Sequence, residues 1–188
     1  MKGMTVKMKT KNLTFTAICA ALTVVFAQLI IPLPFTPIPF SMAIFAVYLT
    51  GTLLPMSYSF YAQLVYLLLG AVGLPVFGGF SGGIGVILGP TGGYILTYPV
   101  MALLVALFIR LFGKKSVLSL AAGMLCALAV CYLGGSLWYS ATADVTWAKS
   151  IVLTILPFIP FDLVKIAICV PLSIALDKAL RKTNLLPA

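Results

Sequence analysis

The segment IVLTILPFIPFDLVKIAICVPLSIALDKAL, residues 151–180, decides the fold of this chain. Two charges aside, its residues 151–176 stay apolar for longer than the roughly 20 residues that a helix needs to cross a membrane. Those charges are Asp162 and Lys165, and at the helical spacing i, i+3 their side chains share one face. A charge at bilayer depth costs at least about 2.5 kcal/mol, so such residues usually face a partner, a cavity or a ligand. The segment therefore predicts a membrane helix that carries one polar site.

Three prolines lie in the same segment: Pro157, Pro160 and Pro171. Proline removes a backbone donor and bends or breaks a helix. We therefore expect a kinked or broken final helix rather than one straight rod. Backbone carbonyls that lose their partner in this way are tolerated at membrane depth where they line a cavity. The prolines just before Asp162 thus favour a pocket at that point.

The composition of the whole chain is typical of a membrane protein. Of its 188 residues, 62% are hydrophobic and 8% are charged, and the mean hydropathy is +1.19. These values lie outside those of ordinary soluble domains. Once the loops are subtracted, this length accommodates about six spanning helices. We therefore expect one all-α integral membrane domain, residues 1–188, built as a six-transmembrane-helix bundle.

Side chains that enzymes and metal sites use are scarce in this sequence. It contains no His and no Glu, and its acidic residues are Asp144, Asp162 and Asp177. The cysteines lie in apolar segments without the spacing of a metal site: Cys19, Cys126, Cys131 and Cys169. A cysteine of this kind commonly behaves as a small buried hydrophobe. We therefore expect no enzymatic activity, no metal and no cofactor.

Six apolar runs predict the spans. They cover residues 13–31, 41–54, 57–74, 94–112, 117–139 and 151–180. A basic start before the first run is also typical of a signal peptide, but the run is long for one and further spans follow it. We therefore expect an uncleaved first helix.

Lys and Arg residues, which give the chain a net charge of +9, gather in short clusters. The clusters precede the first span, follow Arg110 and end the chain, as in cytoplasmic segments of membrane proteins. They do not form the interleaved basic face of a nucleic-acid-binding protein. Both termini are therefore expected in the cytoplasm, with Asp162 in the outer half of the bilayer and its site open to the outside.

Two irregular loops are expected on the outer side. The Pro-rich run PLPFTPIPF, residues 32–40, cannot continue a helix, and PVFGGFSGGIGVILGPTGG, residues 75–93, is too rich in glycine for a regular one. The second run has no nucleotide-binding motif, and its interleaved apolar residues favour a loop packed over a pocket rather than a linker. We expect both loops to gate the site, with Pro37 and Pro39 stiffening the first.

Several residues within the predicted spans are further candidates. Polar side chains that either line a pocket or bond to a neighbouring helix are Gln28, Tyr48 and Gln63. Ala17 and Ala21 form a small-xxx-small patch that lets another helix approach closely. Packing within the bundle and contact with a partner are equal alternatives for this patch.

Taken together, the long motifs of the chain resemble the BioY family, the biotin-specific S components of energy-coupling-factor (ECF) vitamin transporters. The motifs are GLPVFGGFSGGIGVILGPTGGY at residues 73–94, PFIPFDLVK at residues 157–165, YLLLGAVGLPVF at residues 66–77 and the Pro-rich run. The resemblance covers nearly the whole chain. It implies an outward-facing vitamin pocket in the cell membrane of a prokaryote. It also implies a transmembrane coupling subunit, two cytoplasmic ATPases and docking through Ala17 and Ala21.

By position, Asp162 and Lys165 match the pair that the resemblance assigns to biotin, and residues 89–94 match the signature loop. We expect Asp162 to accept hydrogen bonds from the ureido NH groups, and Lys165 to meet the ureido carbonyl or to hold Asp162 charged. The biotin carboxylate would meet backbone NH groups or the Thr91 hydroxyl. The full set of expected biotin-binding residues is Asp162, Lys165, Thr91, Gly92, Tyr94, Gly89, Gly85, Tyr48 and Gln63.

Departures from the family pattern occur at Phe161, where a small residue is usual, and at Ser41 and Ala43, where threonine and glutamine are usual. They concern details of the pocket.

Two other interpretations of the function stay open. The first is a stand-alone oligomeric carrier or ion-coupled transporter that uses Asp162 as an ion or proton site. The second is a structural membrane protein in which Asp162 and Lys165 form an internal ion pair.

Overall fold

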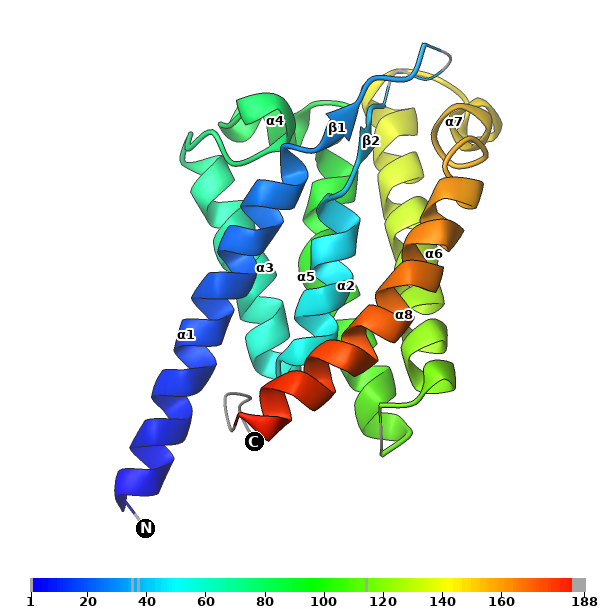
Figure 1. The fold of residues 1–188 in the computed structure, drawn as a ribbon. Helices are drawn as coiled ribbons and strands as arrows, with labels where there is room; N and C mark the ends of the chain where they lie inside the picture. Colours follow the sequence, from blue (N-terminus) through cyan, green and yellow to red (C-terminus); the bar gives the residue numbers. More distant parts are fainter. Residues whose placement is uncertain (1, 35, 37, 114, 184–188) are drawn as a thin grey trace.

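The structure is a computed structural model that describes residues 2–34, 36, 38–113 and 115–183, with side chains from residue 10 onward. Its long helices lie side by side, and the first helix begins at the same end of the bundle at which the last helix ends (Figure 1). The elements in chain order are α1 (Lys2–Ala27), β1 (Ile30–Ile31), β2 (Phe40–Ser41), α2 (Ala43–Leu53), α3 (Met56–Ala71), the 3₁₀ helix η1 (Gly78–Phe80), α4 (Ile84–Leu88), α5 (Gly92–Leu111), α6 (Val117–Thr142), α7 (Trp147–Thr154) and α8 (Ile159–Lys182).

Helix α5 organises the packing, because it contacts α2, α3 and α6. Helix α1 packs on α2 and α3, while α8 packs on α2 and α6. Small residues permit the close contacts, as membrane helices require. A Cβ atom on Gly51 of α2 would stand 2.6 Å from the carbonyl oxygen of Ala102 on α5. The buried core therefore follows α5 from Tyr98 to Val105.

Four helices are long and apolar enough to cross a membrane: residues Thr10–Ala27 of α1, α5, α6 and α8. The chain is therefore a mostly helical, multi-pass membrane protein. Helices α2 and α3, with 11 and 16 residues, are shorter than a full crossing. Pro55 separates them and stands at the N-cap of α3, which ends one helix and starts the next within a single turn.

The final apolar segment is broken, as the prolines predict. Helix α7 ends at Thr154 and α8 starts at Ile159, with Pro157 in the break and Pro160 in the first turn of α8. Proline is tolerated there because the first-turn NH groups have no partner within the helix. Pro171 lies inside α8 without ending it. The break places Asp162 in the first turn of a long helix, where the helix dipole stabilises a carboxylate.

Two irregular segments cover the end of the bundle opposite the termini (Figure 1). The Pro-rich loop is held by a short antiparallel pairing of β1 with β2, in which Ile30 faces Ser41. The sequence did not predict this pairing, because two-residue strands are too short to show an alternating pattern. The Gly-rich loop is irregular, as expected, and contains η1 and α4. It is anchored by Phe77, whose buried ring lies where a side chain on Gly70 of α3 would stand.

Candidate functional site

A cavity of about 130 Å³ lies beneath the two loops. Its wall combines the first turns of α5 and α8 with residues from the Pro-rich loop, the Gly-rich loop and α6. Aromatic side chains form much of the wall: Tyr66, Phe77, Tyr94, Tyr98, Tyr132 and Phe158. Among the described lining residues, Asp162 and Lys165 are the charged ones. The cavity is thus a mostly apolar space with one polar spot, which is the usual make-up of a small-molecule site.

Asp162 and Lys165 form a buried ion pair at this spot. Lys165 Nζ lies 2.8 Å from Asp162 Oδ1, and the two residues are 4% and 2% exposed. Lys165 Nζ also donates to the Ser41 carbonyl oxygen at 2.7 Å and sits 3.9 Å from the centre of the Phe40 ring. A buried charge is tolerated only with such partners. The β1–β2 pairing therefore matters for the site, because it brings Phe40 and Ser41 over α8.

The second oxygen of Asp162 is held by another helix. Tyr132 of α6 donates its hydroxyl to Asp162 Oδ2 at 2.7 Å. A carboxylate offers about four lone-pair positions, so two bonded oxygens still leave room for further donors. The ammonium of Lys165 carries three protons, of which Asp162 and Ser41 take two. The pair thus offers acceptor positions and one donor side by side, which suits a planar group with NH and carbonyl functions.

Comparison with known proteins places this site in a family. The BioY family model matches residues 4–182. The chain belongs to the BioY family. Its relatives include a probable biotin transporter BioY from Pyrococcus horikoshii, 42% identical over 87% of this chain and 94% of the relative. The biotin transporter BioY2 of Lactococcus lactis is 33% identical over 94% of this chain and 95% of its own length. These BioY relatives are described as transporters rather than enzymes.

A solved structure of an S-component for biotin has the same fold. The crystal structure of the S-component for biotin from an ECF-type ABC transporter, at 2.1 Å, matches with a TM-score of 0.85 and 26% identity. The match covers 92% of this chain and 93% of the other. The helical arrangement around α5, with its interruptions above the cavity, is therefore that of an S component.

Four of the expected biotin-binding residues line the cavity: Asp162, Lys165, Thr91 and Tyr94. Pro39, expected in the gating loop, lines it as well. Thr91 is the N-cap residue of α5, next to the start of that helix. Tyr94 donates its hydroxyl to the Thr154 carbonyl oxygen at 3.3 Å, which ties α5 to the end of α7. Pro37 lies outside the described residues. The structure thus brings the charged pair, the α5 start and one loop proline to the same space.

Three glycines named for the pocket lie outside its lining. The Gly89 carbonyl accepts a hydrogen bond from the Trp138 ring nitrogen at 3.0 Å. A side chain on Gly92 would collide with the Ile87 carbonyl, so this glycine permits α4 to meet α5 closely. Gly85 in α4 faces open space. These positions shape the Gly-rich loop, and their contact with a ligand stays a prediction.

Polar residues named within the spans also lie apart from the lining. Gln63 donates to the hydroxyls of Thr23 and Thr50, both at 3.0 Å, and so joins α3 to α1 and α2. Tyr48 is fully buried, and within the described part of the chain its hydroxyl has no hydrogen-bond partner. Gln28 donates to the Val76 and Phe77 carbonyls and accepts from the Phe80 NH, which fastens the Gly-rich loop to α1.

Sequence reasoning did not name several contributors to the site, among them Tyr132, Phe40, Tyr98 and Phe158. Tyr132 lies 30 positions before its partner Asp162, and nothing in its local pattern distinguishes it from other aromatic residues of α6. Phe40 reaches Lys165 through the β1–β2 pairing. For Tyr132 and Phe40 the contact joins α8 to elements that are distant in sequence, so the local sequence carries no signal for it. Phe158, in contrast, lies four residues before Asp162 in the motif of residues 157–165.

The alanine patch lies on the outer side of α1. Ala17 and Ala21 are exposed, and Leu13 and Val25 continue the same stripe at spacings of four residues. Ala20, in contrast, is buried against the bundle. The packing within this chain therefore uses Ala20 and leaves Ala17 and Ala21 uncovered, while docking of a partner there stays a prediction.

Proposed function

We propose that this protein is the biotin-capturing S component of an ECF-type uptake transporter. The observation that carries the proposal is the buried Asp162–Lys165 pair in the wall of an aromatic cavity, in a chain of the BioY family. A purely structural ion pair has no need of a cavity beside it. Biotin offers a planar ureido group with two NH donors and one carbonyl, which matches the acceptors and the donor of the pair.

In this proposal the ureido ring binds the charged pair. Asp162 accepts from the NH groups through its remaining lone pairs, and the third proton of Lys165 meets the ureido carbonyl. The aromatic wall encloses the thiophane ring and the valerate chain. The biotin carboxylate then reaches the start of α5, where the Thr91 hydroxyl and the first-turn NH groups favour an anion.

The two loops act as the gate. The cavity volume of about 130 Å³ is below the roughly 300–1,000 Å³ typical of small-molecule sites. The two loops must therefore move before a ligand can bind. The Pro-rich loop contributes Ile38 and Pro39 to the wall, and the Gly-rich loop contributes Phe77, Gly78 and Ser81. Glycines with positive φ at Gly79 and Gly83 give the second loop its freedom to rearrange.

The chain works as one part of a transporter. Helices α1, α2, α3, α5, α6 and α8 form a six-helix transmembrane bundle whose cavity faces outward and whose termini face the cytoplasm. Biotin enters from the outside of a prokaryotic cell membrane, and Ala17 and Ala21 dock the transmembrane coupling subunit. Two cytoplasmic ATPases supply the energy, since the chain has no Walker motif. An ion-coupled mechanism has weaker support, because Lys165 already neutralises Asp162.

Calorimetric titration of the purified chain with biotin tests the proposal. The wild-type chain is expected to bind one biotin, and Asp162→Asn is expected to weaken binding at least about a hundredfold, because a buried charged hydrogen-bond pair is lost. Asp177→Asn is the matched control, since it removes an aspartate from the same helix outside the cavity. A wild-type chain without affinity for biotin would overturn the proposal, as would equal losses in both variants.

A further inference from the structure

A second cavity, of about 440 Å³, lies at the other end of the bundle, where α2, α5 and α8 end and α3 begins. Tyr98 in the first cavity and Arg110 in the second are about 18 Å apart along α5, at 1.5 Å per residue. The two cavities are therefore separate. The biotin proposal uses no residue of the second one.

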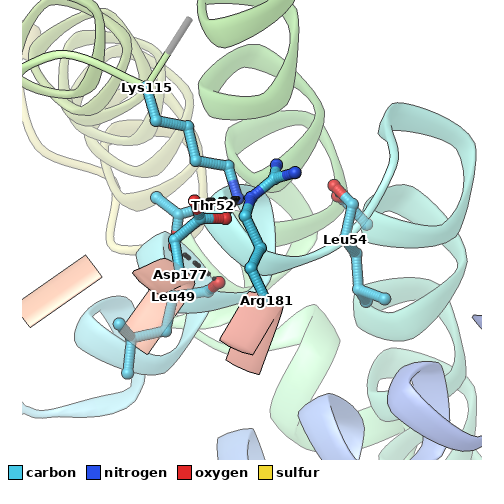
Figure 2. Close-up of polar contacts among 7 residues, drawn as sticks. Leu49, Thr52, Leu54, Lys115, Asp177 and Arg181 are labelled. Carbon is cyan, nitrogen blue, oxygen red and sulfur yellow. Dashed lines mark hydrogen bonds and ion pairs between the residues drawn. The ribbon is translucent and has the colours of Figure 1, made fainter. Parts of the chain in front are cut away.

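The charged side chains among the described lining residues of the second cavity are all basic. Arg110, Lys115 and Arg181 line it, and no acidic residue is among its described lining residues. Asp177 stands beside it, and Figure 2 shows Lys115 and Arg181 reaching this one carboxylate. The distances are 2.5 Å from Lys115 Nζ to Asp177 Oδ1 and 2.8 Å from Arg181 Nε to Asp177 Oδ2. Within the described part of the chain, Arg110 has no ion pair.

The charges at this cavity do not cancel. Three basic side chains against one carboxylate leave an excess of two positive charges. The C-terminal ends of α2, α5 and α8 each offset about half a charge, and the N-terminal end of α3 adds about half. The first turn of α3, from Met56 to Tyr58, lines the cavity without a side-chain cap. The remaining excess of about one positive charge attracts an anion.

The surroundings favour an anion that carries an apolar part. Leu111 and Phe112 follow Arg110, and Val117 and Leu118 follow Lys115; all four are exposed apolar residues. Basic pockets between membrane helices are suited to phosphate-bearing lipid headgroups. We propose that this cavity binds the phosphate group of an anionic phospholipid headgroup, with Arg110 as a direct contact and Lys115 and Arg181 beside it.

The test measures lipid binding by the full chain in detergent, by native mass spectrometry with phosphatidylglycerol. One molecule is expected to bind tightly, and Arg110→Gln is expected to bind it about fivefold more weakly, the change for one basic side chain facing a headgroup. Arg110→Lys is expected to retain most of the affinity. Lys149→Gln is the matched control, because it removes one exposed positive charge on α7, at the other end.

Separate titrations decide whether the phosphate belongs to a lipid or to a free ion, and whether the Arg110→Gln variant is still folded. Phosphatidylcholine and inorganic phosphate are expected to bind more weakly than phosphatidylglycerol. Inorganic phosphate that binds as tightly as phosphatidylglycerol would overturn the lipid proposal and identify a free anion as the ligand. Equal losses of phosphatidylglycerol affinity in Arg110→Gln and Lys149→Gln would overturn the site. Biotin titration of Arg110→Gln is expected to match wild type, so failure of this proposal is distinguishable from failure of the biotin proposal.

Discussion

Each end of this bundle carries an aspartate of α8 paired with a lysine, yet the two pairs have different surroundings. Asp162 and Lys165 are neighbours on one helix, nearly completely buried beneath two loops. Asp177 pairs with Lys115 from the α5–α6 connection and with Arg181, whose side chain is 65% exposed. The buried pair is neutral and is held by Tyr132 and the Ser41 carbonyl, whereas the open cluster keeps an excess of positive charge. Burial therefore decides whether such a pair recognises a polar ligand by hydrogen bonds or attracts an anion by net charge.

The largest expected effect is at the buried pair. Lys165→Met leaves the Asp162 carboxylate buried without its counter-charge, which we expect to lower the free energy of unfolding by about 3–5 kcal/mol. Thermal unfolding in detergent, with and without biotin, measures it. The double variant Asp162→Asn/Lys165→Met is expected to regain most of this stability without regaining biotin binding. A double variant as unstable as Lys165→Met would contradict this account.

A smaller change in the free energy of unfolding is expected at Tyr132, and none or a gain at Tyr48. Tyr132→Phe removes a hydrogen bond to the Asp162 carboxylate and is expected to cost about 1.5–3 kcal/mol of unfolding free energy. Tyr48→Phe removes a hydroxyl that has no partner in the described part of the chain, so stability is expected to stay the same or rise. Parallel unfolding curves measure both, and biotin titration of Tyr48→Phe tests whether its hydroxyl contacts the ligand. Equal losses of stability would refute the distinction.

The smallest loss of stability is expected at the Asp177 cluster, at the end of the bundle that holds the basic cavity. Asp177→Asn breaks two ion pairs within reach of solvent, and we expect a loss of about 1 kcal/mol or less, which shrinks further in high salt. Because the variant also removes the one carboxylate near the basic cavity, phosphatidylglycerol is expected to bind it more tightly than wild type. Unfolding in low and high salt and the lipid titration measure these changes. A loss as large as that of Lys165→Met would remove the contrast between the two ends.

Several features of the fold were predictable because their signals are local. The apolar runs predicted the helices, and the prolines between residues 157 and 171 predicted the break before α8. The glycines of residues 75–93 predicted an irregular loop, which the structure confirms. Of its interleaved apolar residues Phe77 is buried, whereas Phe80, Ile84 and Leu88 are exposed. The runs 41–54 and 57–74 predicted two further spans, and the structure has helices of 11 and 16 residues there, α2 and α3, so their crossing of the membrane stays a prediction.

The candidate site was predictable only in part. Asp162 and Lys165 stand out in any apolar segment, because a buried charge is costly. Gln63 and Tyr48 stand out for the same reason but lie apart from the cavity lining, since the sequence does not specify which neighbour a polar side chain meets. Tyr132 and Phe40 reach the charged pair from α6 and β2, which are joined to it only through packing.

The sequence by itself determined that this chain is a helical membrane protein of the BioY family with one charged pair in an apolar helix. Hydropathy, proline positions and long motifs are properties of consecutive residues, so they need no three-dimensional information. Only the tertiary structure decided that the pair lies in the wall of an aromatic cavity, that a tyrosine from α6 holds it, and that a separate basic cavity occupies the other end. Those contacts join residues far apart in the chain, and they exist only once the helices have packed.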